Sequence, residues 1–301
     1  MEKKNKRVIA LGFFDGVHIG HGALLRRVAT RAHQLGAVPA AVTFDTRPKE
    51  LVLNQSTPLL STAKERSDLM RSLYGVQEVI VLPFDSSFMH MDWQEFVTDF
   101  LIARHGAVHL IAGHDFRFGY QGAGNAVRLQ KQCAQSGIGC DIIAPVSLDG
   151  ITVSSTYIRT LVAQGEMYLA MKFLGHPHTI IARASHGNVS GPPSDTATIT
   201  LTLPPGSVVP ASGVYATRIW VDGKAYSAAT ALGVHSSISS GQPVLAESFL
   251  LNFNGEFCEQ NVRLEFYQRV QLEQKYRDAA DFCTYITGDA EMVKSYFSVR
   301  W

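Results

Sequence analysis

The chain has 301 residues, about twice the length of a typical domain, so we expect two domains. Its 27 lysine and arginine residues nearly balance 26 aspartate and glutamate residues, which argues against a nucleic acid or an acidic membrane surface as partner. The basic start MEKKNKR precedes an apolar run that is too short for a signal peptide or a membrane span. We therefore expect a cytoplasmic protein.

The first notable segment, residues 9–27, reads IALGFFDGVHIGHGALLRR and combines an apolar strand, a glycine-containing loop and the start of an amphipathic helix. Glycines such as Gly16 and Gly20 would let the backbone approach an anion, and a helix N-terminus adds N–H donors. His18 and His21, in the pattern H-x-G-H, could donate hydrogen bonds to phosphate oxygens. The order strand, loop, helix favours a nucleotide triphosphate site; the alternative is an exposed loop with incidental histidines.

Apolar strands and helical periodicity then alternate through the first half of the chain. After the helix that ends at Gly36, helices are expected at 61–74, 92–104 and 126–136, and buried strands at 38–44, 78–82, 108–113 and 140–144. Strands that are apolar throughout are typical of a parallel sheet covered on both faces. We therefore predict an α/β domain with a Rossmann-like parallel sheet, with ligands at the carboxyl ends of the strands.

Two more loops at that edge carry polar and aromatic residues. DTRP at 45–48 follows the second strand, and GHDFRFGYQGAG at 113–124 follows the fourth. In the longer loop, Phe116 and Phe118 alternate with polar residues, so one ring could face a planar ligand while Asp115 meets its polar edge. The alternative is a mobile surface turn.

A further helix is expected in VSSTYIRTLVAQGEM, residues 153–167. Ser154 or Ser155 could cap this helix, with Arg159 one turn inside it. Hydroxyls, free N–H donors and a guanidinium together suit a polyphosphate tail. The alternative is a plain cap and a solvated arginine.

From His178 onward, short β-rich runs separated by turn signals replace the helical pattern. The runs cover 196–203, 213–221, 225–233, 247–253 and 261–270, and a closing helix is expected at 279–297. This pattern predicts a small antiparallel β-barrel with a C-terminal helix. We place the boundary so that the domains cover residues 1–177 and 178–301.

Cysteines are few and are not arranged as a metal motif. Cys133, Cys140, Cys258 and Cys283 include no C-x-x-C pair. In a chain without a secretory signal, we expect them to be reduced and buried rather than to form disulfides or a zinc site.

Four motifs carry a resemblance to a known family. GFFDGVHIGH, TFDTRP, AGHDFRFG and VSSTYIR occur in the order and approximate spacing of the prokaryotic bifunctional riboflavin kinase/FAD synthetases, and the chain resembles that family over essentially its whole length. The resemblance implies an FMN adenylyltransferase domain of the H-x-G-H nucleotidyltransferase superfamily. Such a domain converts ATP and FMN into FAD and pyrophosphate with Mg²⁺.

The resemblance also implies roles for individual residues, by matched position. Catalytic contacts would come from His18, His21 and Arg159, and further ATP contacts from Gly12, Phe13, Phe14, Asp15, Gly16, Gly20, Ser154, Ser155 and Thr156. Flavin contacts would come from Asp115, Phe116, Arg117 and Phe118. Two positions depart from the family pattern: His114 replaces an acidic residue, and Arg47 replaces the histidine of F-x-P-H-P.

The barrel resembles the family's riboflavin kinase less closely. Glu247 stands where the family has the carboxylate that takes the proton from the riboflavin hydroxyl. The family's G-F-P-T-A-N falls on GPPSDT, so Ser194 replaces its threonine and Thr196 its asparagine. EFCE at 256–259 replaces the D-L-Y-G turn, and Gln271 replaces an arginine.

These three losses predict a degenerate kinase site, with activity weak or absent and the barrel serving as a scaffold or a flavin-binding module. One alternative is a fully bifunctional enzyme, and a less favoured one is a non-catalytic flavin-binding regulatory protein. The intact His18, His21 and Arg159 argue against the regulator, because a protein that only binds flavin does not need triphosphate ligands.

Overall fold

The computed structural model describes residues 5–47, 57–186, 196–233, 244–253, 257–272 and 279–300. They form two compact units: Met1–Thr57 with Ser61–Ser154, and Pro58–Leu60 with Ser155–Trp301.

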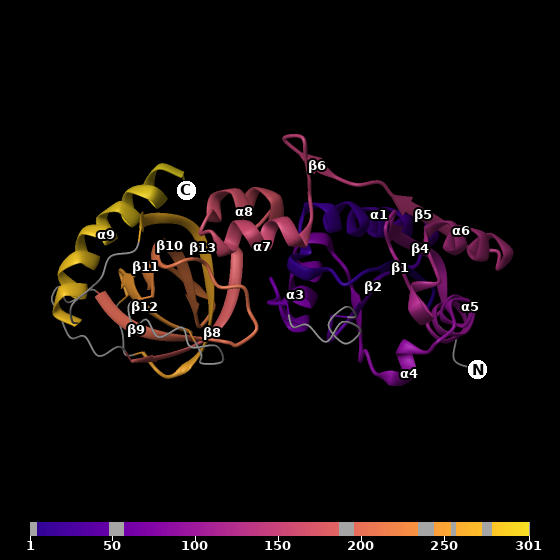
Figure 1. Cartoon of the computed structure of the whole chain (residues 1–301), viewed down its shortest axis with the longest axis horizontal. Coiled ribbons are helices and arrows are strands. Elements are labelled where there is room, and N and C mark those ends of the chain that lie inside the picture. Colours follow the sequence, from indigo (N-terminus) through magenta and orange to yellow (C-terminus); the bar gives the residue numbers. More distant parts are fainter. Residues whose placement is uncertain are drawn as a thin grey trace. The chain divides into compact units, whose positions relative to one another are not determined.

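The first unit is built on a parallel sheet of five strands in the order β3-β2-β1-β4-β5 (Figure 1). The strands are β1 (Arg7–Leu11), β2 (Val38–Phe44), β3 (Glu78–Leu82), β4 (Ala107–Gly113) and β5 (Gly139–Ile143). All four pairings are parallel. The predicted Rossmann-like sheet is therefore confirmed.

Helices cover both faces of this sheet. Alternate residues of β1 face opposite sides and therefore pack in two different cores. Val8 and Ala10 pack in one core with α1 (Ile19–Leu35) and α3 (Ala63–Tyr74). Ile9 and Leu11 pack in the other core. Helix α6 (Ala126–Gln135) and residues 96–104 contribute to that second core.

The ends of the two long helices of the first core follow local signals. Helix α1 ends at Gly36, whose φ of 57° lies in the left-handed region that glycine adopts most easily. Helix α3 begins with a capping box in which Thr62 and Glu65 satisfy each other's main-chain N–H groups.

The helix expected at 92–104 is more irregular than predicted. A short helical turn, α5 (Trp93–Glu95), continues as a π-helix, η2 (Phe96–Arg104), with buried Phe96 and Phe100 on its inner side. The remaining short elements of this unit are η1 (Asp15–Val17), α4 (Ser86–Met89), η3 (Tyr120–Gly122), β6 (Ser147–Leu148) and β7 (Ile151–Thr152).

The second unit is a closed antiparallel barrel in the order β10-β11-β12-β9-β8-β13, as predicted (Figure 1). Its strands are β8 (His178–His186), β9 (Thr196–Leu203), β10 (Gly213–Val221), β11 (Lys224–Leu232), β12 (Val244–Leu251) and β13 (Gln260–Leu272). Strand β8 was not among the predicted runs. The C-terminal helix α9 (Ala279–Arg300) packs Val293 and Phe297 against Val214 and Ala229 of the barrel.

Helices α7 (Ser155–Ala163) and α8 (Met167–Leu174) belong to the second compact unit. The expected boundary between residues 177 and 178 remains a prediction about where the functional domains divide. Among the residues that the structure describes, no helix is both long enough and apolar enough to cross a membrane.

Candidate active site

Two of the predicted loops leave neighbouring strands at one edge of the sheet. From β1 the chain runs outward to β2 and β3, and it then crosses to β4 and β5 on the other side of β1. In sheets of this kind, ligands bind at the carboxyl ends of the strands where the order reverses. The H-x-G-H loop follows β1 and the loop of residues 113–124 follows β4, so the topology brings both to this reversal point.

The loop after β1 has an unusual backbone. Phe14, Gly16 and Val17 have φ values of 58°, 76° and 41°. Positive φ is unfavourable for a β-branched residue such as Val17, and such strain persists only where surrounding contacts impose it. Backbone strain of this kind is concentrated at functional sites.

Ser61, which the sequence analysis did not select, supplies part of that restraint. Its Oγ accepts a hydrogen bond from the N–H of Gly16 at 2.8 Å, and its own N–H donates to Oδ1 of Asp15 at 3.1 Å. Asp15 is only 2% exposed. The buried Asp15 carboxylate therefore ties the loop to Ser61.

The two histidines of the motif lie against each other. Their rings stack with centroids 3.6 Å apart and 13° between the planes. Nδ1 of His18 accepts a hydrogen bond from the main-chain N–H of His21 at 3.2 Å, which makes His18 the N-cap of α1. In the neutral ring, Nε2 of His18 then carries the proton and can donate it to an acceptor.

His21 is held in its neutral form. Burial lowers the pKa of His21 well below its ordinary value, and the neighbouring His18 and Arg66 lower it further. Its Nδ1 is buried and has no hydrogen-bond partner among the described residues. Imidazole N–H groups at a helix N-terminus can serve as hydrogen-bond donors to phosphate oxygens.

Arg66 is the second residue of this region that the sequence analysis missed. Its side chain is completely buried, and its Nη1 and Nη2 donate to the carbonyl oxygens of Ser61 at 2.8 Å and Phe44 at 2.6 Å. Its guanidinium carbon lies 4.2 Å from the centre of the Phe13 ring. No local signal in the helical segment STAKERSDL distinguishes this arginine from a solvated one.

The two phenylalanines of the loop after β4 differ in how deeply they are buried. Phe118 is 7% exposed and packs against Phe96 in the core, with ring centroids 5.5 Å apart. Phe118 and Gly124 exchange main-chain hydrogen bonds, and a Cβ at Gly124 would lie 2.6 Å from Cε2 of Phe118. Phe116 is half-buried and stacks on Phe118 at 5.5 Å, which leaves Phe116 as the ring available to a planar ligand.

The other residues predicted in this loop are exposed, and those predicted in the following helix lie at the division between the two units. Asp115 and Arg117 are exposed. Ser154 ends the first unit, whereas Ser155, Thr156 and Arg159 lie at the start of α7 in the second unit. Their part in an ATP site remains a prediction.

The expected kinase residues are only partly described. Ser194 lies outside the described residues, and Thr196 is the first residue of β9. Both carboxylate oxygens of Glu247 accept from Oγ1 of Thr200, its cross-strand partner, at 2.9 and 3.1 Å. The described residues include no group of three or more His, Cys, Asp or Glu side chains that could hold a metal ion.

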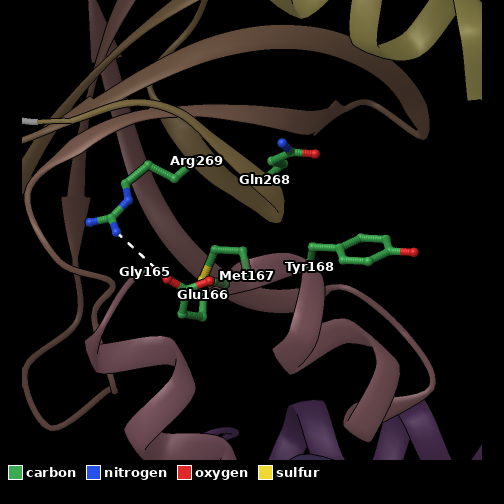
Figure 2. A pocket seen from close by; sticks show the side chains of 6 residues that line it. All are labelled: Gly165, Glu166, Met167, Tyr168, Gln268 and Arg269. Atoms are coloured by element: carbon green, nitrogen blue, oxygen red, sulfur yellow. Dashed lines mark ion pairs between the residues drawn. The ribbon is translucent and has the colours of Figure 1, made fainter.

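The second unit also contains a pocket that the sequence did not indicate. It has a volume of about 380 Å³ and is lined by Gly165, Glu166, Met167, Tyr168, Gln268 and Arg269. Figure 2 shows Arg269 directed toward Glu166, with Nη2 and Oε1 4.0 Å apart. A Cβ at Gly165 would lie 2.9 Å from the guanidinium carbon of Arg269, so the turn packs closely on this side chain.

Comparison with known proteins matches each half of the chain to a family of its own. A model of the FAD synthetase family matches residues 1–157, and a model of the riboflavin kinase family matches residues 174–297. Two relatives named bifunctional riboflavin kinase/FMN adenylyltransferase are similar over nearly their full length. The relative from Listeria monocytogenes is 28% identical, and the match covers 97% of this chain and 93% of the relative. The relative from Pseudomonas fluorescens is 30% identical, and the match covers 96% of this chain and 92% of the relative.

A solved structure has the same fold. It is described as a macrolide-efflux protein from Streptococcus pneumoniae and is 26% identical to this chain. The match has a TM-score of 0.84 and covers 100% of this chain and 96% of that one.

Proposed function

Since the chain belongs to the bifunctional riboflavin kinase/FMN adenylyltransferase family, we propose that the strained loop after β1 holds ATP for AMP transfer to FMN, and that the barrel phosphorylates riboflavin weakly or not at all. The protein is an FMN adenylyltransferase, with ATP and FMN as substrates and FAD as product. The observation that carries the proposal is the pair of stacked histidines at the N-terminus of α1.

The chemistry needs no covalent intermediate on the protein. The phosphate of FMN is ionised at neutral pH, and one of its oxygens attacks the α-phosphorus of ATP while pyrophosphate leaves. Catalysis then depends on positioning and on stabilising the charge of the transferring group. Nε2 of His18 and the neutral ring of His21 would donate to its oxygens, alongside the first main-chain N–H groups of α1.

Other groups would complete the ATP site. Gly12, Phe13 and Phe14 would line it, with Gly16 and Gly20 allowing close approach of the phosphates. Ser154, Ser155, Thr156 and Arg159 would hold the outer phosphates through hydroxyls and a guanidinium. Mg²⁺ binds substrate phosphates with few protein ligands, so we expect it to arrive with ATP and to neutralise the phosphate charge.

The flavin would lie beside the loop after β4. The half-buried ring of Phe116 is the surface on which the flavin ring would stack, and Phe118 supports that ring from the core. The exposed side chains of Asp115 and Arg117 would meet the polar edges of the ligand.

The kinase part of the proposal depends on three sequence changes. Thr196 lacks the amide that an asparagine would offer to Mg²⁺ and phosphate, Gln271 lacks a guanidinium, and EFCE replaces the D-L-Y-G turn. A fully bifunctional enzyme is the second candidate. It is supported by the match of residues 174–297 to the riboflavin kinase family and by the presence of Glu247.

The adenylyltransferase site is tested with purified protein, Mg²⁺, ATP and FMN. FAD should form, and His21→Ala should lower turnover with ATP much more than it lowers FMN binding, measured by flavin fluorescence. Equal losses of both would indicate a structural role for the loop.

The kinase is tested by replacing FMN with riboflavin in the same assay. We expect little or no FMN. FMN formation at a rate comparable to that of FAD formation from FMN would contradict a degenerate barrel and establish the bifunctional alternative. Flavin binding without any FAD formation would instead favour a regulatory protein.

A further inference from the structure

Arg66 carries a charge where packing alone would favour an apolar side chain. It is one of the largest fully buried side chains among the described residues, and it lies in the first turn of α3. Burial lowers the pKa of Arg66, whereas Asp15, Glu65 and Asp45 are the acidic groups that favour its charged form. An arginine in water has a pKa above about 12, so the group stays charged at neutral pH. Burying such a charge is costly unless it is paired and hydrogen-bonded.

The contacts of Arg66 join three segments around the strained loop. Nη2 donates to Phe44 at the end of β2, and Nη1 donates to Ser61 just before α3. The guanidinium lies against the ring of Phe13 in the loop itself. Ser61 in turn binds Asp15 and Gly16, so Arg66 is connected through Ser61 to both of these hydrogen bonds of the loop.

Arg66 is also a fixed positive charge that acts on His21. Because burial holds His21 neutral, its ring does not supply a full positive charge at neutral pH. The groups that act electrostatically on His21 are His18, beside it on the loop, and Arg66, from α3. Nε of Arg66 is buried without a hydrogen-bond partner among the described residues. One N–H group of the guanidinium is therefore left without a hydrogen bond to the described part of the chain.

We propose that Arg66 is a positioning residue for the adenylyl transfer, which fixes the H-x-G-H loop and provides the positive potential that attracts the ATP triphosphate. This inference rests on the proposed function, because it assumes that the loop binds ATP. It predicts that Arg66 affects ATP and the ionisation of His21 but not the binding of FMN.

The test compares Arg66→Met, which removes the charge, with Arg66→Lys, which keeps the charge but not the paired hydrogen bonds. Arg71→Met is the matched control, because Arg71 lies on the same helix and its side chain is 48% exposed. Among the described residues, its one ion pair is with the surface residue Asp68 at 3.8 Å. Thermal unfolding is measured for each variant before kinetics. Steady-state kinetics then give KM for ATP, kcat and the pH profile of kcat/KM.

We expect both Arg66 variants to raise KM for ATP at least about fivefold, in keeping with loss of a charge-assisted contact, with FMN affinity unchanged. In Arg66→Met, the pKa of His21 followed by NMR should rise, because a neighbouring positive charge has been removed, and the acidic limb of the pH profile should move up with it. In Arg66→Lys the charge remains, so the limb should stay near its wild-type position. The control should match the wild type throughout.

Several outcomes would overturn the inference. If both variants fold and KM for ATP stays unchanged, Arg66 has a structural role only. If Arg66→Met does not fold, Arg66→Lys decides, because an unchanged KM for ATP in that variant contradicts a positioning role. If the wild-type protein itself makes no FAD, the proposed function fails instead, and the NMR titration of His21 still tests the electrostatic link.

Discussion

Nδ1 of His18 lies 3.2 Å from the main-chain nitrogen of His21 and accepts its hydrogen bond, so one ring both caps α1 and belongs to the candidate site. The two roles can be separated. His18→Ala should remove the cap, which should lower the free energy of unfolding by about 1 kcal/mol. It also removes the imidazole from the candidate site. His18→Asn should keep the cap, because asparagine is a favourable N-cap residue.

We expect both His18 variants to lose FAD formation by about 10²-fold or more, as when one preorganised donor to a transition state is removed. Only His18→Ala should show a lower urea midpoint. An active His18→Asn protein would mean that His18 acts through the cap alone.

Gly22 is a second position in α1 where the structure sets a clear limit. A Cβ at Gly22 would overlap the hydroxyl of Tyr74 on α3, in the core that supports the loop. Gly22→Ala should therefore lower the free energy of unfolding by about 1–3 kcal/mol, although alanine favours helices. Gly288→Ala in α9 is the matched control, because a Cβ there meets nothing within 4 Å.

The control should raise stability by up to about 1 kcal/mol. Urea unfolding of the two variants checks both signs. A stabilised Gly22→Ala protein would show that Tyr74 moves aside easily.

The barrel contains a chain of buried hydroxyls across β10, β11 and β12. Oγ1 of Thr230 lies 2.7 Å from Oγ1 of Thr217 and 2.8 Å from Oγ of Ser248, and all three residues are 0% exposed. Thr230→Val should remove the partner of the buried Ser248 hydroxyl, whereas Thr217 still donates to the carbonyl oxygen of Ala228. The loss should cost about 1–3 kcal/mol. Thr202→Val, at a half-buried position of β9, should change stability by less than about 0.5 kcal/mol.

Replacing all three hydroxyls with apolar groups should restore much of the loss, because no partner is then left unsatisfied. The measurement is the urea midpoint of each variant. A triple variant that is much less stable than Thr230→Val would contradict this account.

Much of this fold could be predicted from local sequence patterns. The predicted bounds of Val38–Phe44 and Gly213–Val221 are confirmed, because continuous apolar or alternating runs end at clear turn residues. Gly36 ends α1 as expected because its backbone requires positive φ. The H-x-G-H loop could also be predicted from a local pattern, because its glycines and histidines lie next to one another in the sequence.

The remainder depends on contacts between distant segments. Arg66 occurs in a polar helical stretch, and only the approach of Phe44, 22 residues away, and of Phe13 makes it a buried group. Alternation in DFRFG indicated that one aromatic ring could face a planar ligand, but only its packing on Phe96 shows that Phe118 is the inner ring. The π-helix of residues 96–104 is likewise set by packing, since its apolar spacing also fits an ordinary helix.

His178, at the start of β8, should make stability depend on pH. Burial lowers its pKa from 6.5 to about 4, although its Nε2 lies 3.0 Å from the carbonyl oxygen of Val208, a contact that favours the protonated form. The folded protein then binds fewer protons than the unfolded chain between these two values. Stability is therefore fully present above pH 6.5 and is lost as the pH falls toward 4.

Between pH 7 and pH 5 this single group should remove about 2 kcal/mol from the free energy of unfolding. His178→Gln keeps a side-chain N–H for Val208 but does not titrate, so its stability should fall by about 2 kcal/mol less than that of the wild type over the same range. Between pH 7 and pH 8 the two proteins should show the same change. Urea unfolding at pH 5, 7 and 8 measures both differences, and parallel curves for the two proteins from pH 7 to pH 5 would show that His178 does not titrate in this range.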